Sequence, residues 1–307
     1  MRRLQYFYRH TRVAGASFDY HGKPIAILKG RIIASGLLAC YYVAGTISPT
    51  FRIVALGLVA LVLPWLLARS FRFRFHNSSY RGIRFAFSGS TRSAYWVFLG
   101  LPALSMFTLF TLVPFWHQRM KRYQHANATY GQTRFTYDAP VSGFYSTYVV
   151  AALLSLGFLI GFGVATFAMV SQVPRTPVSG SMQRASALVP LLMLVVFYWM
   201  GVFGVRSFVN ARVQNLVWRH TRLGPHAFDS DVMAVRLFYL TVTNLIGTVA
   251  TLGLFQPFGQ VRLAQYVTSR FSLVPAGRLD DVVAGDEPDI AATGEEAAAL
   301  FDIDIAL

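Results

Sequence analysis

The chain of 307 residues is strongly apolar and basic: 54% of its residues are hydrophobic, only 13% are charged, and its formal net charge is +15. Soluble domains contain roughly 25% charged residues, so this composition and a mean hydropathy of +0.46 exclude an ordinary soluble domain and indicate an integral membrane protein. The single cysteine, Cys40, excludes an intramolecular disulfide and a thiolate cluster.

The charges are divided unevenly along the chain. All 28 basic residues lie at or before Arg278, where only four acidic residues occur, and the other nine acidic residues follow it. We therefore predict a membrane domain with tandem repeats at residues 1–278 and an acidic tail at residues 279–307, disordered in the cytoplasm. The basic residues fix the orientation of the spans by the positive-inside rule, and they also attract anionic lipid headgroups.

Six apolar runs follow one another along the chain, at residues 32–48, 53–68, 94–116, 143–170, 185–205 and 237–258. These runs contain 16 to 28 residues, and crossing about 30 Å of hydrocarbon takes roughly 17 to 25. Only Pro49-Thr50-Phe51-Arg52 joins the first two, so we expect them to form an antiparallel hairpin. The predicted fold class is all-α: a polytopic membrane helical bundle with an internal duplication, about six hydrophobic segments and short interfacial turns between them.

Four related basic stretches lie between the runs, at residues 9–20, 77–87, 127–137 and 219–230. Each contains a hydroxyl residue, then a glycine, then an aromatic residue six or seven positions after the hydroxyl. A glycine turn followed by alternating aromatics is typical of a short extended segment, and amphipathic aromatics are also typical of a membrane interface. We favour the interfacial interpretation.

Two of the apolar runs end in the same motif. Residues 114–123 and 257–266 share the pattern Pro-Phe-x-x-x-Arg-x-x-x-Tyr at an offset of 143 residues, and a Thr-Leu pair begins six residues before each proline. An internal duplication explains this match. Basic residues flank both runs on both sides, which positive-inside counting disfavours for simple crossings. The alternatives are ordinary crossings with a weak charge bias, and re-entrant or strongly tilted segments.

Three stretches near the start carry a family resemblance: Arg-Arg-Leu-Gln-Tyr-Phe-Tyr-Arg-His-Thr-Arg at 2–12, Phe-Asp-Tyr-His-Gly-Lys-Pro at 18–24, and Tyr-Arg-Gly-Ile-Arg-Phe at 80–85. They resemble the YjgN-like family of bacterial inner-membrane proteins, and the resemblance covers about residues 1–278. It implies a multi-pass protein of the bacterial cytoplasmic (inner) membrane. The family is functionally uncharacterised, so the resemblance supplies no catalytic residues. It also implies a further hydrophobic segment ahead of Met1, or the loss of that segment.

Catalytic constellations are missing from the sequence. None of the six runs contains Asp or Glu, all seven histidines lie outside them, and no phosphate-loop, nucleophile-elbow or zinc-protease motif occurs. Asp19 and His21 form the only close acid–base pair, which is more often a surface contact than a site. We therefore predict no enzymatic activity, no catalytic residue, no cofactor and no metal site. Without a basic soluble domain we also predict no nucleic-acid partner.

Two hypotheses for function remain. In the first, the duplicated segments surround a polar path for a small solute, an architecture common among transporters; helix packing is the other explanation of its polar residues. That path is lined by Thr108, Thr111, Thr241, Asn244, Thr248 and Thr251. In the second, a non-transporting lipid-binding or scaffold subunit grips membrane lipids, chiefly anionic phospholipids, by a basic collar. The collar consists of Arg119, Lys121, Arg122, Arg134 and Arg262. We favour the first, and homo-oligomerisation is left open.

Overall fold

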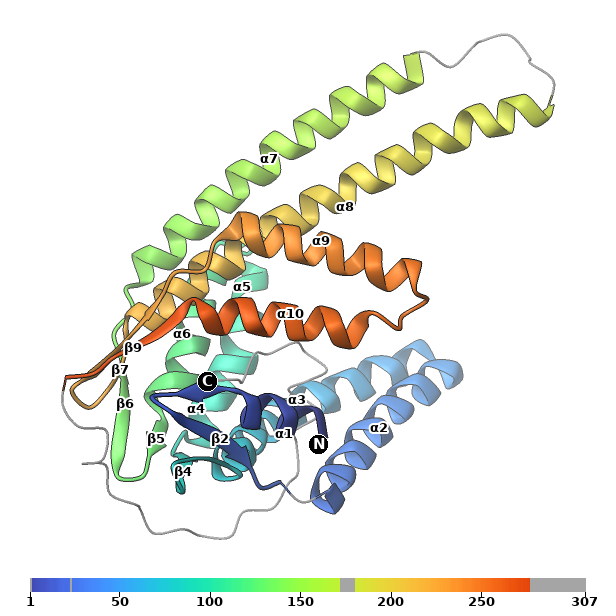
Figure 1. The fold of residues 1–307 in the computed structure, drawn as a ribbon. Coiled ribbons are helices and arrows are strands. Elements are labelled where there is room, and N and C mark those ends of the chain that lie inside the picture. Colours follow the sequence, from blue (N-terminus) through green and yellow to red (C-terminus); the bar gives the residue numbers. More distant parts are fainter. Residues whose placement is uncertain (1, 23, 172–179, 277–307) are drawn as a thin grey trace. The chain divides into compact units, whose positions relative to one another are not determined.

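The computed structural model describes residues 2–22, 24–171 and 180–276 (Figure 1). These residues belong to two units. The first unit contains the chain up to Val141, the segment Arg219–Phe228 and the residues from Leu273 onward; the second contains Ser142–Trp218 and Asp229–Ser272. The acidic tail predicted at 279–307 lies outside the described residues.

Helices make up most of the described chain. They are α1 (Arg2–His10), α2 (Pro24–Ile47), α3 (Pro49–His76), α4 (Thr91–Tyr95), the π-helix η1 (Trp96–Gly100), α5 (Leu101–Phe107), α6 (Val113–Ala126), α7 (Val141–Ser171), α8 (Gly180–Arg219), α9 (Ala234–Ala250) and α10 (Gln256–Ser269). The predicted apolar runs at 32–48, 53–68, 143–170 and 185–205 coincide with α2, α3, α7 and α8.

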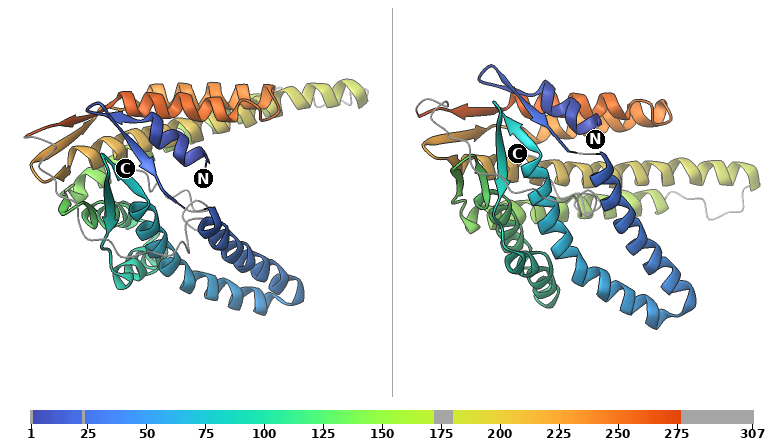
Figure 2. Two further views of the ribbon diagram at one scale, coloured as in Figure 1. Left: turned by 60° about the horizontal axis from the view of Figure 1, so that its bottom comes forward. Right: turned by 90° about the horizontal axis from the view of Figure 1, so that it is seen from below.

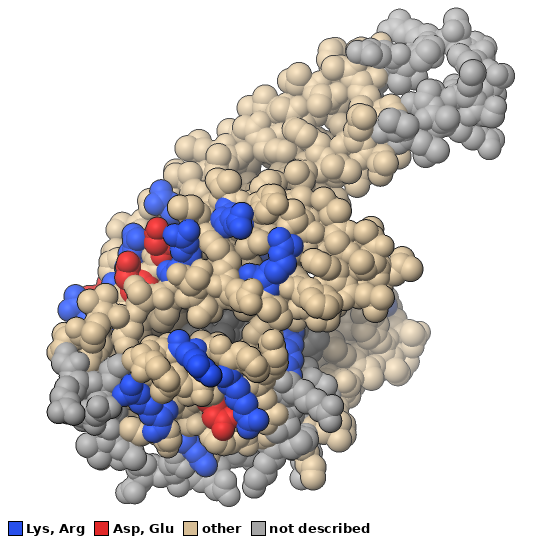
Figure 3. Space-filling view, in the orientation of Figure 1, with Lys and Arg blue, Asp and Glu red and all other residues tan. Residues whose placement is uncertain are grey.

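In the described part of the chain, three helical segments are long and apolar enough to cross a membrane: Pro49–His76, Val141–Met169 and Pro190–Arg219. Only 6% of the most apolar window is buried in the second and in the third, so protein does not cover these surfaces. Lipid covers such surfaces at low free-energy cost, whereas water does not. The visible surface of α7 in Figure 3 accordingly carries no Lys, Arg, Asp or Glu. The protein is therefore a membrane protein.

Helices α2 and α3 form the predicted antiparallel hairpin, which is the blue pair of helices in Figure 2. The connection is even shorter than predicted, because Ser48 alone separates them and Pro49 begins α3. The Ser48 hydroxyl accepts a hydrogen bond from the Thr50 amide at 3.2 Å, which caps α3, and the Arg52 side chain donates to the Gly45 carbonyl at 3.0 Å.

The predicted all-α fold class is wrong, because the stretches between the helices are strands rather than interfacial turns. The strands are β1 (Arg12–Val13), β2 (Ala16–Tyr20), β3 (Ser78–Tyr80), β4 (Ile83–Phe87), β5 (Ala128–Tyr130), β6 (Thr133–Tyr137), β7 (Thr221–Leu223), β8 (His226–Ser230) and β9 (Phe271–Val274). They form one nine-stranded sheet in which each strand is hydrogen-bonded to the next along the chain, and the registered pairs are antiparallel.

The turns explain why these stretches are extended. Ala14 and Gly15 have φ angles of 46° and 81°, and Arg81 and Gly82 have φ angles of 48° and 78°. Two consecutive residues with positive φ match the two-residue type I′ hairpin, whose twist suits antiparallel strands, and glycine adopts this conformation without steric cost. The glycine in each basic stretch was thus the signal for a hairpin.

An aromatic ladder runs along the sheet within the first unit. It consists of Phe18, Phe85, Phe135 and Phe228, one from each of β2, β4, β6 and β8, with successive ring centroids 6.3, 6.5 and 6.1 Å apart. Phe85, Phe135 and the neighbouring Tyr80 and Tyr130 belong to the hydrophobic core, and Phe18 and Phe228 are partly buried and pack against it. The alternating aromatics of the basic stretches therefore pack against each other, with the period of two that a strand imposes.

The other two apolar runs, 94–116 and 237–258, are not continuous helices. Each breaks at one point, where Leu109 and Phe110 have φ angles of 49° and 63° and Leu252 and Gly253 have φ angles of 51° and 98°. The bounds of the helices around these breaks agree at an offset of 143 residues: Thr91 and Ala234, Phe107 and Ala250, Val113 and Gln256, Ala126 and Ser269. We call residues 91–126 the first hairpin and residues 234–269 the second hairpin.

Candidate functional site

The first hairpin folds back on itself through two side chains of α6. The Trp116 indole Nε1 donates a hydrogen bond to the Val97 carbonyl at 2.8 Å, and the Tyr123 hydroxyl donates to the Ser90 carbonyl at 3.3 Å. The Val97 carbonyl lies in the π-helix η1, where the wider turn departs from the regular α-helical pattern. The base of the hairpin, where α4 begins and α6 ends, is thus closed by Tyr123.

A pocket of about 440 Å³ opens at this base. We call it the arginine pocket, and its main lining residues are Arg92, Trp96, Arg119, Arg122, Tyr123 and Asn127. One wall comes from α4 and η1, and the other comes from α6. No acidic residue of the described chain lines the pocket, so its three guanidinium groups share one cavity without a compensating carboxylate.

The three arginines are available to a ligand to different degrees. Arg92 and Arg122 are exposed, and Arg119 is half-buried, with its guanidinium carbon 4.9 Å from the centroid of the Phe115 ring. A cation over an aromatic face is held by the ring quadrupole and keeps its N–H groups free at the edge. The pocket is therefore a cationic site whose central arginine is already oriented.

The second hairpin uses its matching arginine differently. Arg262 stands 143 residues after Arg119, and its Nη1 donates to the Asn244 side-chain oxygen at 2.9 Å. Asn244 in turn donates to the Gly259 carbonyl at 2.9 Å, so the pair ties α9 to α10. At the positions that match Arg92 and Arg122, the second hairpin has Val235 and Gln265. The arginine pocket therefore has no counterpart there.

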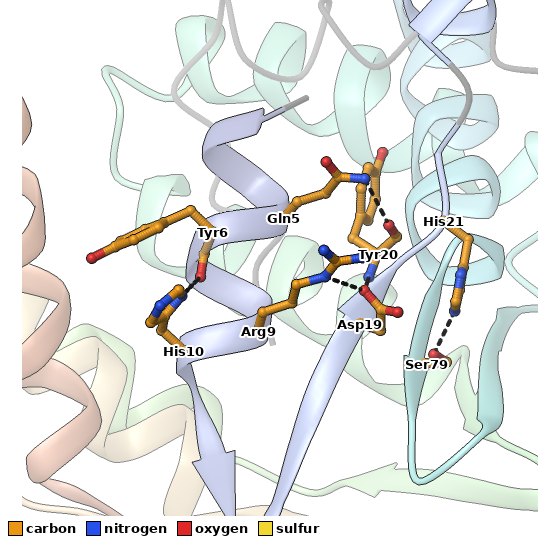
Figure 4. A network of polar contacts seen from close by, with 8 residues as sticks. All are labelled: Gln5, Tyr6, Arg9, His10, Asp19, Tyr20, His21 and Ser79. Atoms are coloured by element: carbon orange, nitrogen blue, oxygen red, sulfur yellow. Dashed lines mark hydrogen bonds and ion pairs between the residues drawn. The ribbon is translucent and has the colours of Figure 1, made fainter.

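The side chains of Asp19 and His21 bind different partners in the structure (Figure 4). The Asp19 carboxylate accepts a hydrogen bond from Arg9 Nε at 3.0 Å and another from the Tyr20 amide at 2.9 Å, whereas the His21 ring contacts the Ser79 hydroxyl at 2.8 Å. Burial raises the pKa of Asp19, but the hydrogen bonds from Arg9 and the Tyr20 amide outweigh it and leave this pKa below its usual range. Asp19 thus serves a surface ion pair between α1 and β2.

Comparison with models of protein families shows which family the chain belongs to. The model of a family described as "Bacterial protein of unknown function (DUF898)" matches residues 1–300. The chain belongs to this family. The resemblance to YjgN-like proteins is thereby confirmed. No curated protein and no solved structure matches the chain.

In this family member, the six residues of the predicted polar path all bond to nearby backbone. Asn244 bridges the second hairpin, as described above. The hydroxyl groups of the other five donate to carbonyls three or four residues earlier on the chain: Thr108, Thr111, Thr241, Thr248 and Thr251. Each of these hydroxyl groups therefore has its hydrogen-bond acceptor in its own segment of the chain, which suits a residue that packs between helices. Thr108 and Thr111 belong to the first unit and the other four to the second.

The residues of the predicted basic collar have different surroundings. Arg119 and Arg122 line the arginine pocket, whereas Arg262 is bound to Asn244. Arg134 lies on β6 and donates to the Ser88 hydroxyl at 3.1 Å. Burial lowers the pKa of His117 and His125 on α6, and the positive charge of Lys121 lowers it further. Sequence reasoning missed Arg92 and Trp96 as site residues. Their only signal was their position at the start of the run 94–116, opposite the Arg-x-x-x-Tyr motif.

A buried histidine lies on α6 close to the pocket. His125 is buried and stacks on Tyr137 of β6, with ring centroids 5.7 Å apart. Burial, assisted by the positive charge of Lys121, lowers the pKa of His125 from its usual 6.5 to about 3. The imidazole is therefore neutral in the folded protein over the whole physiological range.

This lowered pKa predicts a pH-dependent stability. Below pH 6.5 His125 binds a proton in the unfolded chain but not in the folded chain, so this residue alone should lower the free energy of unfolding by about 1.4 kcal/mol per pH unit as the pH drops from about 6.5 toward the folded pKa. Denaturant unfolding in detergent at pH 7 and pH 5 measures this slope. A His125→Gln variant should show a shallower decline, and an unchanged slope would contradict a neutral, buried imidazole.

Proposed function

We propose that the protein is a multi-pass protein of the bacterial cytoplasmic (inner) membrane that binds anionic phospholipid headgroups in its arginine pocket. The observation that carries the proposal is a cavity with three guanidinium groups and no acidic lining residue in the described chain. Arginine binds phosphate through two parallel N–H···O bonds, which a lysine cannot offer. Each basic residue near an anionic leaflet contributes about 1 kcal/mol.

The exposed apolar residues at the tips of the two hairpins support a position of the pocket at the membrane surface. Phe107 beside the first turn is 86% exposed and Leu252 in the second is 96% exposed, and Leu109 and Leu254 are also exposed. Apolar side chains this open to solvent would be unfavourable in water, so we infer that the tips enter the hydrocarbon. The arginines at the base of the first hairpin would then lie at the level of the lipid headgroups.

The turns themselves suit a re-entrant hairpin. A break in a helix leaves backbone groups unpaired, which hydrocarbon does not tolerate. At the first turn the Phe110 amide donates to the Ser105 carbonyl at 2.8 Å, and at the second the Gly253 amide donates to the Thr248 carbonyl at 2.7 Å. The Thr251 hydroxyl also accepts from the Phe255 amide at 2.9 Å. We infer that these backbone bonds, and the Thr251 side chain at the second turn, stabilise the turns at membrane depth.

The side-chain contacts of the predicted polar path favour lipid binding over passage of a solute. Passage of a small solute needs polar groups directed at a path, whereas the path residues hydrogen-bond to nearby backbone. Transport stays a prediction, and loss of a measured solute flux in an Asn244→Leu, Thr248→Leu variant would support it. We also propose that the two hairpins arose by internal duplication, since the matching bounds and φ angles support that origin. Lipid binding developed in the first copy only.

Lipid retention by charge-matched variants tests the proposal. Arg92 and Arg122 should be replaced by Gln in one variant, and in the control variant Arg236 and Arg270, exposed at the base of the second hairpin, should be replaced by Gln. Both lose two charges. Native mass spectrometry in a neutral detergent should show phosphatidylglycerol bound to the wild type and to the control, with affinity about tenfold or more lower in the pocket variant. Equal loss in both variants would contradict a specific pocket.

A further inference from the structure

We infer that the arginine pocket selects a lipid headgroup with two phosphate groups, as in cardiolipin, over a headgroup with one. The inference rests on the proposed function and narrows its ligand class. Three observations carry it: the number of uncompensated positive charges, their distribution over two helices, and the shape of the lining.

The charge of the pocket exceeds what one phosphodiester supplies. A phosphodiester carries a single negative charge, so with Arg92, Arg119 and Arg122 around it two positive charges would face each other uncompensated. Like charges in one cavity repel, and a ligand with two phosphates removes more of that repulsion. Basic pockets on the cytoplasmic side of membrane proteins bind such multiply charged headgroups.

The arginines also fall into two groups in space. Arg119 and Arg122 are three residues apart on α6, which places them on one helix face within about 5–6 Å at their Cβ atoms. Arg92 comes from α4, on the other wall. One phosphate can therefore be held by the pair on α6 and a second by Arg92.

The lining offers room and an interfacial surface for such a lipid. A volume of about 440 Å³ lies within the range of roughly 300–1,000 Å³ usual for small-molecule sites. Trp96 lines the pocket and is 55% exposed, so its indole can lie against the glycerol region, where tryptophan is favoured. The π-helix that begins at Trp96 occurs only in the first of the two hairpins, since α9 is regular at the matching residues.

A competition series tests the inference. The wild-type protein in neutral detergent should be equilibrated with cardiolipin, phosphatidylglycerol or phosphatidylcholine at equal phosphate concentration, and binding measured by native mass spectrometry. We expect cardiolipin to bind about tenfold or more tightly than phosphatidylglycerol. An Arg92→Gln variant should lose more affinity for cardiolipin than for phosphatidylglycerol, and therefore most of this preference, whereas the Arg236→Gln control should keep it. Thermal melting of each variant verifies that it is folded.

The possible results distinguish failure of the two-phosphate preference from failure of anionic lipid binding as a whole. Equal affinity for cardiolipin and phosphatidylglycerol, both above phosphatidylcholine, would overturn the two-phosphate inference and leave anionic lipid binding standing. No preference over phosphatidylcholine would overturn the proposed function as well. A further arm uses inorganic pyrophosphate: displacement of cardiolipin supports recognition of two phosphates, whereas pyrophosphate binding without any cardiolipin preference would identify a soluble diphosphate as ligand and contradict lipid selection.

Discussion

Replacement of Phe71 by alanine should lower the free energy of unfolding by about 3–5 kcal/mol, the usual cost of removing a fully buried phenylalanine side chain. Phe71 on α3 is 0% exposed and packs on Phe87, Phe98 and Tyr123, with ring centroids 5.3, 6.2 and 6.0 Å away. These rings come from β4, η1 and α6. The cavity left by the mutation would thus loosen the sheet, the π-helix and the pocket wall together.

Denaturant titration of the purified protein in detergent measures this loss. The matched control is Phe107→Ala, because Phe107 is an exposed phenylalanine at the tip of the first hairpin and has no comparable packing to lose. We expect the control to change the free energy of unfolding by less than about 1 kcal/mol in detergent. Similar losses in both variants would mean that Phe71 is not a core residue.

Replacement of Asn215 by leucine should cost about 3 kcal/mol or more, since it removes three hydrogen bonds from one place. The Asn215 side chain donates to the Val232 carbonyl at 3.0 Å and accepts from the Val232 amide at 2.8 Å and from the Ser230 hydroxyl at 2.9 Å. Val232 and Ser230 are buried, so their polar groups would lose their partner without gaining water. Each unsatisfied buried group costs roughly 1–3 kcal/mol.

An Asn215→Asp variant provides the graded control for this prediction. Its carboxylate keeps both acceptor contacts and loses only the bond donated to the Val232 carbonyl, so we expect a smaller loss of stability than in Asn215→Leu, by thermal melting at one pH. If leucine is tolerated as well as aspartate, the three contacts do not stabilise the fold. In the first unit the residue 143 positions earlier is Arg72, which donates to the Gly89 carbonyl at 2.8 Å, so a side-chain hydrogen bond links the corresponding segments in both units.

The long helices were predictable because their stability in a membrane depends on local composition. A run of apolar residues satisfies its backbone within one helix, and the runs at 53–68 and 143–170 accordingly lie within α3 and α7. The break in the run 94–116 was not marked locally, because Leu109 and Phe110, which adopt the left-handed conformation there, are apolar residues without a turn signal.

The sheet was not predictable from these local signals. Its strands have two to five residues, and the partners Phe18 and Tyr80, Phe85 and Tyr130, and Phe135 and Leu223 are separated by whole helices. A glycine turn indicates a hairpin, but only the tertiary structure shows that one hairpin pairs with the next. The interfacial interpretation of the aromatic residues therefore did not predict that they pack against one another across the strands.

The sequence alone determined that this protein belongs in a membrane and that the Arg-x-x-x-Tyr motif occurs twice, because hydropathy and spacing are properties of the chain itself. Only the tertiary structure decided what each arginine does. Arg119 and Arg262 occupy the same position in the motif, yet one faces a pocket and the other is bound by Asn244. The difference depends on residues from the opposite helix, Arg92 in one hairpin and Asn244 in the other, which contact the motif only after the chain folds back.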